Sequence, residues 1–334
     1  MPLTDTATAT DRAVVFNGRQ VVLAERRFEP LQPNQVRLRA EFTHVSIGTE
    51  IAYIDEYTRT QQSTGLGYSF VGIIEELGSD VRGWSRGQRV LTFANHASAA
   101  HVTVEPAALV LVPEGLSPDK AVLSILGSIA YHVVQRAAPR MLEHTVVLGQ
   151  GVVGSLIAQV ARLCGVDPIV VDTDAGRLSV AREIGFRTVD ATREDALARV
   201  KELTGGKGAS LCIEAATSAK AIDNAMKMLA LRGRLVLTST IFEPVPFAIL
   251  GDFIERELTV IGAHQPKCPI VPNDYYLWNQ VDNRTAAMLA MRDGKLKVEH
   301  LISHRVKPHE APPLYERLRA KDRSIVGMVI DWTA

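Results

Sequence analysis

A glycine-rich turn is the part of the sequence whose residue types and spacing point most directly to chemistry. The stretch TVVLGQGVVGSLIAQVA carries Gly149, Gly151 and Gly154 in the pattern Gly-x-Gly-x-x-Gly, after an apolar β-type run and before an apolar helical run. A dinucleotide fingerprint needs this context, because the glycines allow a tight turn, close approach of a pyrophosphate, and close packing of helix on strand. Free N–H groups at the helix start would then hold the phosphates.

An acidic residue follows at the spacing such a site requires. The next β-type run, PIVVD, ends at Asp172, about 20 residues beyond the fingerprint. A carboxylate there accepts hydrogen bonds from the adenosine ribose and repels a 2′-phosphate, which favours NAD over NADP. Arg177 lies close enough to favour the opposite choice. A chance glycine turn followed by an N-cap aspartate is the alternative, but strand, loop, helix and acid all occur in register.

A second stretch gathers polar groups without an obvious role. HVSIGTEIAYIDEY, residues 44–57, places hydroxyl and carboxylate groups around Gly48, but it has no cysteine and only one histidine, at its edge. Three interpretations stay open: a metal site that lost its metal, a site that never held one, or an ordinary turn between strands.

The secondary-structure elements that must position these residues follow two different patterns along the chain. Short β-type runs with turn signals between them fill the first third, which predicts a barrel-like or sandwich unit. From Ser117 onward, apolar β-type runs alternate with helical runs, which predicts a doubly wound parallel sheet. The β-type runs of the first third are AVVF, QVRLRAEF, FVGIIEEL, QRVLTF, AAHVTV and ALVLVP.

Composition narrows the class of protein. The 334 residues suffice for two domains. Lys+Arg and Asp+Glu both number 37, so no net charge steers the chain to nucleic acid or to an anionic membrane. Three scattered cysteines argue against a disulfide framework and for a reducing, cytoplasmic location. Residues 1–10 have no signal-peptide pattern and predict a flexible tail, and no apolar run is long enough to span a bilayer.

Several stretches together resemble the medium-chain dehydrogenase/reductase family of alcohol and polyol dehydrogenases. They are the β-rich first part, PEGLSPDKAV, the LGQGVVG loop and the C-terminal return. FVGIIEELGSDVRGWSRGQRV is similar to the family's strand–turn–strand signature, with Gly72, Gly78, Gly87 and Val90 in place. The resemblance implies an α/β protein with a GroES-like, β-rich catalytic domain at 11–121 and 265–334. A Rossmann domain with a doubly wound parallel sheet would occupy 122–264.

The positions that carry catalytic zinc in this family are where the sequence departs from it. Ile47 replaces a cysteine, the triplet Gly–Tyr68–Ser replaces Gly–His–Glu, and the third ligand position falls near Ile125. Because zinc needs thiolate, imidazole or carboxylate ligands, the sequence predicts no metal. The SIGTE motif also resembles a zinc-lacking branch that includes bacteriochlorophyllide dehydrogenases.

The resemblance also implies a set of catalytic side chains. Thr49 matches the family's proton-relay hydroxyl, and Tyr68 takes the place of the zinc-binding histidine. Glu50 stands where the family keeps an acid beside the metal, and His96 lies on a segment lining the substrate side. Without a cation, hydrogen-bonding side chains must stabilise the developing alkoxide. Structural roles are the alternatives: a turn cap for Thr49, packing for Tyr68, a paired acid for Glu50 and a satisfied polar histidine for His96.

The remaining site residues follow the later strands. Gly262 and Ala263 would end the last Rossmann strand beside the nicotinamide carboxamide. A mix of aromatic and hydrogen-bonding residues follows, suited either to a polyhydroxylated substrate or to anchoring the loop. The expected substrate residues are His264, Gln265, Tyr275, Tyr276 and Trp278. The expected cofactor residues are completed by Val152, Val153, Ala215, Ser239 and Thr240.

Taken together, the sequence predicts a zinc-independent, NAD(H)-dependent oxidoreductase. Its substrate would be a secondary alcohol or ketone of a small polar molecule such as a polyol, cyclitol or sugar derivative. A zinc-free enoyl or quinone reductase of the same family and a non-catalytic NAD-binding sensor are the alternatives. The resemblance suggests a homodimer or homotetramer formed through the Rossmann domain.

Overall fold

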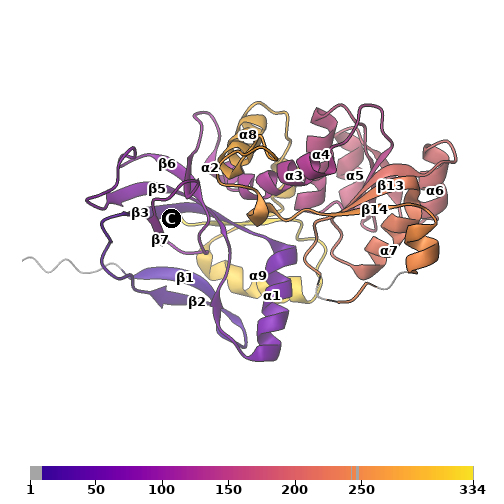
Figure 1. Ribbon diagram of the computed structural model, residues 1–334. Helices are drawn as coiled ribbons and strands as arrows, with labels where there is room; N and C mark the ends of the chain where they lie inside the picture. The colour runs from indigo at the N-terminus through magenta and orange to yellow at the C-terminus, as the bar shows by residue number, and fades with distance from the viewer. Residues whose placement is uncertain (1–9, 242, 246–247, 334) are drawn as a thin grey trace, which may run out of the picture. The chain divides into compact units, whose positions relative to one another are not determined.

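The computed structural model describes residues 10–241, 243–245 and 248–333 (Figure 1). These residues form two compact units, each described here by itself. Unit 1 contains the chain up to Val112, Ser117–Val122, and the chain from His304 onward. Unit 2 contains Pro113–Leu116 and Leu123–Ser303.

Unit 1 is built on one antiparallel sheet and one mixed sheet, in which only the β15–β16 pair is parallel among the described strands. One has the order β2-β1-β4, and the other has the order β15-β16-β3-β5-β6-β8, with β7 also paired to β3. The last strand, β16, pairs with both β15 and β3, so the C-terminus completes a sheet begun near the N-terminus. The strands are β1 (Asp11–Phe16), β2 (Val21–Arg26), β3 (Gln35–Val45), β4 (Thr64–Gly65), β5 (Ser69–Leu77), β6 (Arg89–Thr92), β7 (Ala99–Thr103), β8 (Leu109–Leu111), β15 (His304–Val306) and β16 (Met328–Asp331). The helices are α1 (Ile47–Thr60), α2 (Pro118–Ala121), a short 3-10 helix (Pro308–Glu310) and α9 (Ala311–Arg319).

The polar stretch around Gly48 is the start of a helix, which none of the three sequence interpretations specified. Helix α1 has its N-cap at Ser46, and its last turn ends at Gln61 in the left-handed conformation, with φ 55°. Ile47, Ile51 and Ile54 recur at helical spacing and pack into the core of unit 1. This spacing is a helix signal that the sequence contained. The helix therefore presents one apolar face inward and fixes where Thr49 and Glu50 point.

Unit 2 is a six-stranded parallel sheet with the order β11-β10-β9-β12-β13-β14. The sequence-based prediction of a doubly wound parallel sheet is confirmed, and the order reverses between β9 and β12. The strands are β9 (Thr145–Leu148), β10 (Ile169–Asp172), β11 (Arg187–Asp190), β12 (Ala209–Glu214), β13 (Leu229–Leu237) and β14 (Thr259–Gly262). The helices are α3 (Ser124–Ala137), α4 (Val152–Leu163), α5 (Ala175–Glu183), α6 (Ala196–Leu203), α7 (Ala219–Met228), α8 (Gln280–Arg292), a π-helix (Ile249–Ile254), and 3-10 helices at Gln265–Lys267 and Glu299–Leu301.

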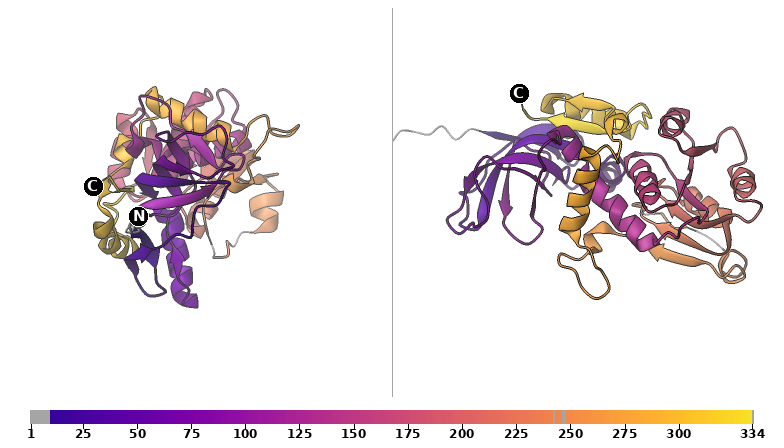
Figure 2. Two further views of the ribbon diagram at one scale, coloured as in Figure 1. Left: turned by 90° about the vertical axis from the view of Figure 1, so that its left-hand side faces the viewer. Right: turned by 90° about the horizontal axis from the view of Figure 1, so that it is seen from above.

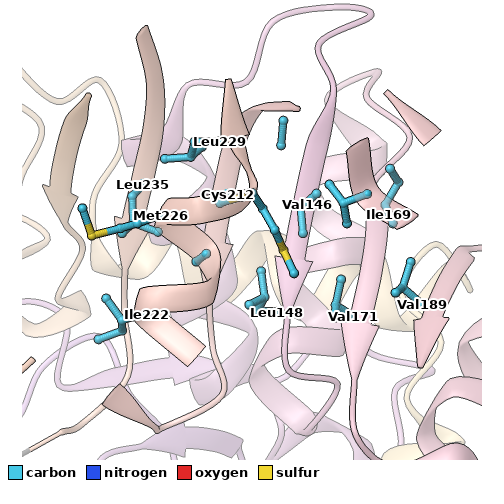
Figure 3. Packing of buried hydrophobic residues seen from close by; sticks show 14 of the residues in the cluster. Val146, Leu148, Ile169, Val171, Val189, Cys212, Ile222, Met226, Leu229 and Leu235 are labelled. Carbon is cyan, nitrogen blue, oxygen red and sulfur yellow. The ribbon is translucent and has the colours of Figure 1, made fainter. Parts of the chain in front are cut away.

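The core of unit 2 explains why its strands lie where they do. Apolar side chains of β9, β10, β12 and β13 interdigitate with those of α7, as Figure 3 shows for Val146, Ile169, Cys212, Met226 and Leu235. Cys212 is fully buried, and burial raises the pKa of its thiol, so it acts as an apolar core residue. Burial on both faces accounts for the nearly continuous apolar runs that marked these strands in the sequence.

Residues 265–303 belong to unit 2, a difference from the predicted domain boundaries, which grouped them with the first domain. Helices α3 and α8 lie side by side (Figures 1 and 2). A Cβ on Gly127 of α3 would lie 2.7 Å from the Cβ of Ala287 of α8, so only glycine permits this approach. Close packing of α8 on α3 therefore holds the segment in unit 2. In the described part of the chain, no helix has the length and apolar character needed to cross a membrane.

Candidate functional site

The glycine loop after β9 has the conformation its sequence predicts. Gly149 has φ +91°, and a Cβ there would lie 2.6 Å from the carbonyl oxygen of Ala215. A Cβ on Gly154 would lie only 1.9 Å from the carbonyl oxygen of Gly149. Gly151 is the N-cap of α4, and Val152 and Val153 form its first turn. The loop therefore closes tightly and leaves the N-terminus of a long helix at the carboxyl edge of the sheet.

This loop lies at the point where the strand order reverses. Strands β9 and β12 are parallel neighbours, with Leu148 opposite Glu214, and the Ala215 N–H donates to the Leu148 carbonyl at 2.8 Å. In doubly wound sheets the crevice at such a reversal is where ligands bind. Ser239 and Thr240 follow β13, and Gly262 and Ala263 close β14. The predicted cofactor residues in unit 2 thus follow the carboxyl ends of its strands.

Asp172 lies beside the loop, and its oxygens are already engaged. Its Oδ2 accepts from the N–H of Gln150 at 2.5 Å, and its Oδ1 accepts from Thr173 and Asp174 at 2.7 and 2.8 Å. A carboxylate has about four acceptor positions, which leaves room for one more donor. The Arg177 guanidinium is the nearest group to a Cβ placed on Gly151, at 3.9 Å. An acid and a cation therefore lie on either side of the same loop.

Three hydroxyl groups meet in unit 1. The Tyr68 hydroxyl donates to Ser46 Oγ at 2.6 Å, and a hydrogen bond also links Tyr68 with the Thr49 side chain. Burial raises the pKa of Tyr68, so the phenol keeps its proton at neutral pH. Thr49 and Tyr68, predicted from positions 19 residues apart, do come together. Ser46, which the sequence reasoning did not assign, is the third member.

Glu50 is the centre of a second, buried set. Its Oε1 accepts from the Ser46 N–H at 2.7 Å, and its Oε2 accepts from the Tyr315 hydroxyl at 2.6 Å and lies 3.2 Å from His96 Nε2. Glu50 is 3% exposed, and His96 and Tyr315 are fully buried. Because the carboxylate accepts, His96 carries its proton on Nε2. Sequence reasoning missed Tyr315, since nothing local connects it to a residue 265 positions away.

The His96 ring also fixes the segment that carries Tyr68. Gly67 has φ +85°, and a Cβ there would lie 2.4–2.5 Å from ring atoms of His96. The backbone N–H of His96 donates to the Leu66 carbonyl at 2.7 Å, and the Asn95 side chain donates to the Gly67 carbonyl at 3.2 Å. The imidazole thus packs directly on the peptide that precedes Tyr68.

His44 lies in the same interior without a hydrogen bond. It is directly opposite Ser69 in the β3–β5 pair, and neither its ring nitrogens nor Ser69 Oγ has a partner among the described residues. Burial lowers the pKa of His44 to about 4, and the nearby Glu50 only partly opposes this. The imidazole is therefore neutral at physiological pH.

The buried His44 predicts acid sensitivity of unit 1. Its folded pKa, about 4, lies below its unfolded value, so stability is present above pH 6.5 and falls as the pH drops toward 4. The loss is about 3 kcal/mol. We expect His44→Leu to flatten this part of the pH–stability profile, measured by urea unfolding at each pH, while exposed His309→Gln leaves it unchanged. A parent-like slope in His44→Leu would contradict the assignment.

The predicted substrate residues of unit 2 are only partly brought together. Tyr276 accepts a hydrogen bond from Arg136 at 3.2 Å, and its ring lies 5.7 Å from that of Trp278, edge to face, and 6.5 Å from that of His132. Burial, and next the nearby Arg136, lower the pKa of His132 to about 4. Gln265 is buried with its Nε2 unbonded within the described chain.

The other two predicted substrate residues differ from each other. Tyr275 is 92% exposed. His264 is also exposed, but it lies close enough to His132 to contribute to the lowered pKa of that residue. Substrate contact and structural anchoring both stay open for the loop.

The residues at the family's zinc positions do not fit a zinc ion. Ile47 packs against the core of unit 1, Ile125 is buried in α3, and the Tyr68 hydroxyl is bonded to Ser46. Two hydrocarbons and one phenol provide no ligand set for this metal. Across the described ranges, no group of three histidine, cysteine or acidic side chains is placed to hold a metal. Independence from zinc remains a prediction.

The known proteins that this chain resembles are dehydrogenases. Residues 152–279 match the family model described as zinc-binding dehydrogenase. A 2-dehydro-3-deoxy-L-galactonate 5-dehydrogenase from Pseudoalteromonas atlantica is 26% identical over 70% of this chain and 76% of its own length. A sorbitol dehydrogenase from Halalkalibacterium halodurans is 22% identical, covering 86% of this chain and 89% of its own.

A solved alcohol dehydrogenase from Thermus sp. ATN1 superposes with a TM-score of 0.79 at 22% identity, over 96% of this chain and 99% of that one. At this identity the likeness concerns the fold. The match to a GroES-like plus Rossmann architecture agrees with the sheets described above. The chain is thus similar to zinc-binding dehydrogenases over residues 152–279, and to a polyol dehydrogenase over most of its length.

Proposed function

We propose that the chain is a zinc-independent oxidoreductase that transfers hydride between NAD(H) and a secondary alcohol or ketone. The substrate class would be a small polyol, cyclitol or sugar derivative. The observation that carries the proposal is the glycine loop at the strand-order reversal, where Gly149 and Gly154 leave no room for a side chain. Polyol and sugar-acid dehydrogenases among the relatives support the substrate class.

The residues of unit 2 fit a dinucleotide. The N-terminus of α4 would hold the pyrophosphate, and the remaining acceptor position of Asp172 would take a ribose hydroxyl. Asp172 favours NAD, whereas Arg177 beside Gly151 would suit a 2′-phosphate. We assign NAD because a carboxylate next to a 2′-phosphate is repulsive, whereas the cation can stabilise the pyrophosphate of either cofactor.

The hydroxyl set of unit 1 would take the role that a cation has in relatives. The bound dinucleotide supplies the hydride acceptor or donor. Tyr68 and Thr49 would hold the substrate oxygen and stabilise negative charge as it develops. With substrate bound, the Tyr68 hydroxyl would turn its proton from Ser46 to the substrate oxygen, and its own oxygen could then accept from the Ser46 hydroxyl. Glu50 and His96 would keep Ser46 and the Tyr68 segment in place rather than touch the substrate.

The removal of one hydroxyl tests this role. We expect Tyr68→Phe to lower kcat/KM about 100-fold, a typical loss for one oxyanion-stabilising donor. Because the glycine loop is proposed to hold the pyrophosphate and Tyr68 only the substrate oxygen, the NADH dissociation constant should stay unchanged. Steady-state kinetics and NADH fluorescence measure the two quantities. Unaltered kcat/KM in both Tyr68→Phe and Thr49→Val would show that other groups stabilise the oxygen.

The function as a whole calls for a three-part experiment. NADH and NADPH binding by fluorescence would establish the cofactor, and an NAD-coupled screen of polyols, cyclitols and sugar acids would establish the reaction. Crotonyl and quinone substrates in the same screen identify an enoyl or quinone reductase instead. Metal analysis of the active protein completes the test, because one zinc per chain would overturn the metal-free proposal. Binding without any turnover would indicate a sensor.

An oligomer formed through unit 2 is part of the proposal. Strand β14 lies at the end of the sheet, and its Val260 is 40% exposed. An open strand edge with an exposed apolar residue is a ready surface for pairing with a second copy. We propose a homodimer or homotetramer that uses this edge, in a reducing cytoplasmic setting consistent with three free cysteines.

A further inference from the structure

Glu214 is a buried acid at the strand-order reversal that the sequence reasoning did not assign. It ends β12 and is fully buried. Its Oε1 accepts from the N–H groups of Ala216 and Thr217 at 2.6 and 3.0 Å, and from the Ser239 hydroxyl at 3.0 Å. Three donors from two loops therefore converge on one oxygen.

The other carboxyl oxygen is unlike the first. Glu214 Oε2 is buried and has no hydrogen-bond partner within the described chain. Burial raises the pKa of Glu214, and the donors to Oε1 oppose this only in part. A buried carboxyl oxygen without a donor is unfavourable, so the interactions that hold Glu214 are concentrated on Oε1. Glu214 therefore gathers the two loops through a single acceptor oxygen.

Residues 215–217, the corner of the chain that Glu214 holds, are in direct contact with the glycine loop. Glu214 lies opposite Leu148, the residue before Gly149. The Ala215 carbonyl lies where a Cβ of Gly149 would be, and the Ala215 side chain lies 3.4 Å from a Cβ position on Gly154. Thr217, at the end of the corner, has φ +51°, a conformation that a threonine keeps only when its surroundings enforce it. A shift of this corner would move the surface on which the glycine loop rests.

We propose that Glu214 is a positioning residue for the dinucleotide, holding residues 215–217 and Ser239 as the second wall of the crevice opposite the glycine loop. The proposal rests on the proposed cofactor-binding function of unit 2. It assigns to Glu214 a role through its neighbours and no contact with the reacting atoms.

Three substitutions separate positioning from general support of the fold. Glu214→Ala removes the acceptor, and Glu214→Asp keeps a carboxyl but withdraws it by one methylene. We expect both to weaken NADH binding about tenfold, because three donors lose their common acceptor. Glu214→Gln keeps an acceptor at Oε1 and should restore binding to within about threefold of the parent, because the three donors keep their common acceptor.

A matched control comes from the opposite edge of the same sheet. Glu143 is a buried acid that pairs with Arg234, 2.6 Å away, just before β9. Glu143→Gln should lower the thermal midpoint of the apo protein while leaving the NADH dissociation constant unchanged. NADH fluorescence titration and apo-protein melting are measured for every variant.

The outcomes are distinct. Parent-like binding by Glu214→Ala and Glu214→Asp would overturn the positioning role, and so would equal weakening by Glu143→Gln. Should Glu214→Ala not fold, the difference between Glu214→Asp and Glu214→Gln decides the matter. A parent protein that binds neither NADH nor NADPH would overturn the proposed function itself, which is a different result from a parent that binds and variants that do not differ.

Discussion

Gly154→Ala should abolish measurable NADH binding and destabilise unit 2. The added Cβ would lie 1.9 Å from the Gly149 carbonyl oxygen and 2.9 Å from its carbon. Both are backbone atoms, so no side chain can rotate away, and the loop itself must open. We expect a loss of about 3 kcal/mol or more in the free energy of unfolding and an NADH affinity reduced more than about 100-fold, since the pyrophosphate site is the loop.

Two other glycines separate the effect on binding from the effect on folding. Gly151 has only the Arg177 guanidinium near its Cβ position, at 3.9 Å, so Gly151→Ala should fold normally. It should still weaken NADH binding, because its methyl group occupies the place a pyrophosphate would approach. Gly251 in the π-helix has open space around it, and Gly251→Ala should change neither quantity. Normal NADH binding by Gly154→Ala would show that the loop holds no dinucleotide.

Glu50→Ala should be among the most destabilising single substitutions in unit 1. Its carboxylate accepts from the Ser46 N–H, from the Tyr315 hydroxyl and from His96, all in the interior. Removing it leaves these buried donors without a partner. Each such group costs about 1–3 kcal/mol, so a total loss of at least about 3 kcal/mol is expected. Urea unfolding followed by tryptophan fluorescence measures it.

A control on the same helix isolates burial as the cause. Glu56 pairs with Arg59 on the exposed side of α1, and Glu56→Ala should change stability by less than about 1 kcal/mol. Tyr315→Phe removes a single donor and should have an intermediate effect. If Glu50→Ala and Glu56→Ala were equally mild, Glu50 would not be the centre of a buried hydrogen-bond set.

The fold of unit 2 was predictable because its signals are local. Continuous apolar runs identify strands buried on both faces, and the glycines of the loop are dictated by contacts within a few residues. Helix α1 was not predicted, because Gly48 and the polar residues around it are also typical of a turn and lie among Ile47, Ile51 and Ile54. The pattern was present, but it competed with a turn signal.

The candidate site was predictable only where single residues carry the signal. Thr49, Tyr68, Glu50 and His96, which the family resemblance selected, are linked in unit 1 through hydrogen bonds that include Ser46, and their part in catalysis stays a prediction. Tyr315 and Glu214 were missed for a physical reason. Each gains its role from partners brought close by tertiary packing, and an isolated tyrosine or glutamate in a sequence gives no sign of that.

Unit 1 is formed by segments that lie far apart in the sequence, and this affects how it can fold during synthesis. Strand β16 and Tyr315 are synthesised more than 250 residues after β3 and α1, yet they complete the sheet and the polar centre that β3 and α1 begin. Unit 2 is nearly continuous and can fold during synthesis. Strand β3 therefore keeps part of one edge unpaired until Met328–Asp331 have been synthesised. The nascent N-terminal segment is therefore where chaperones would be needed most.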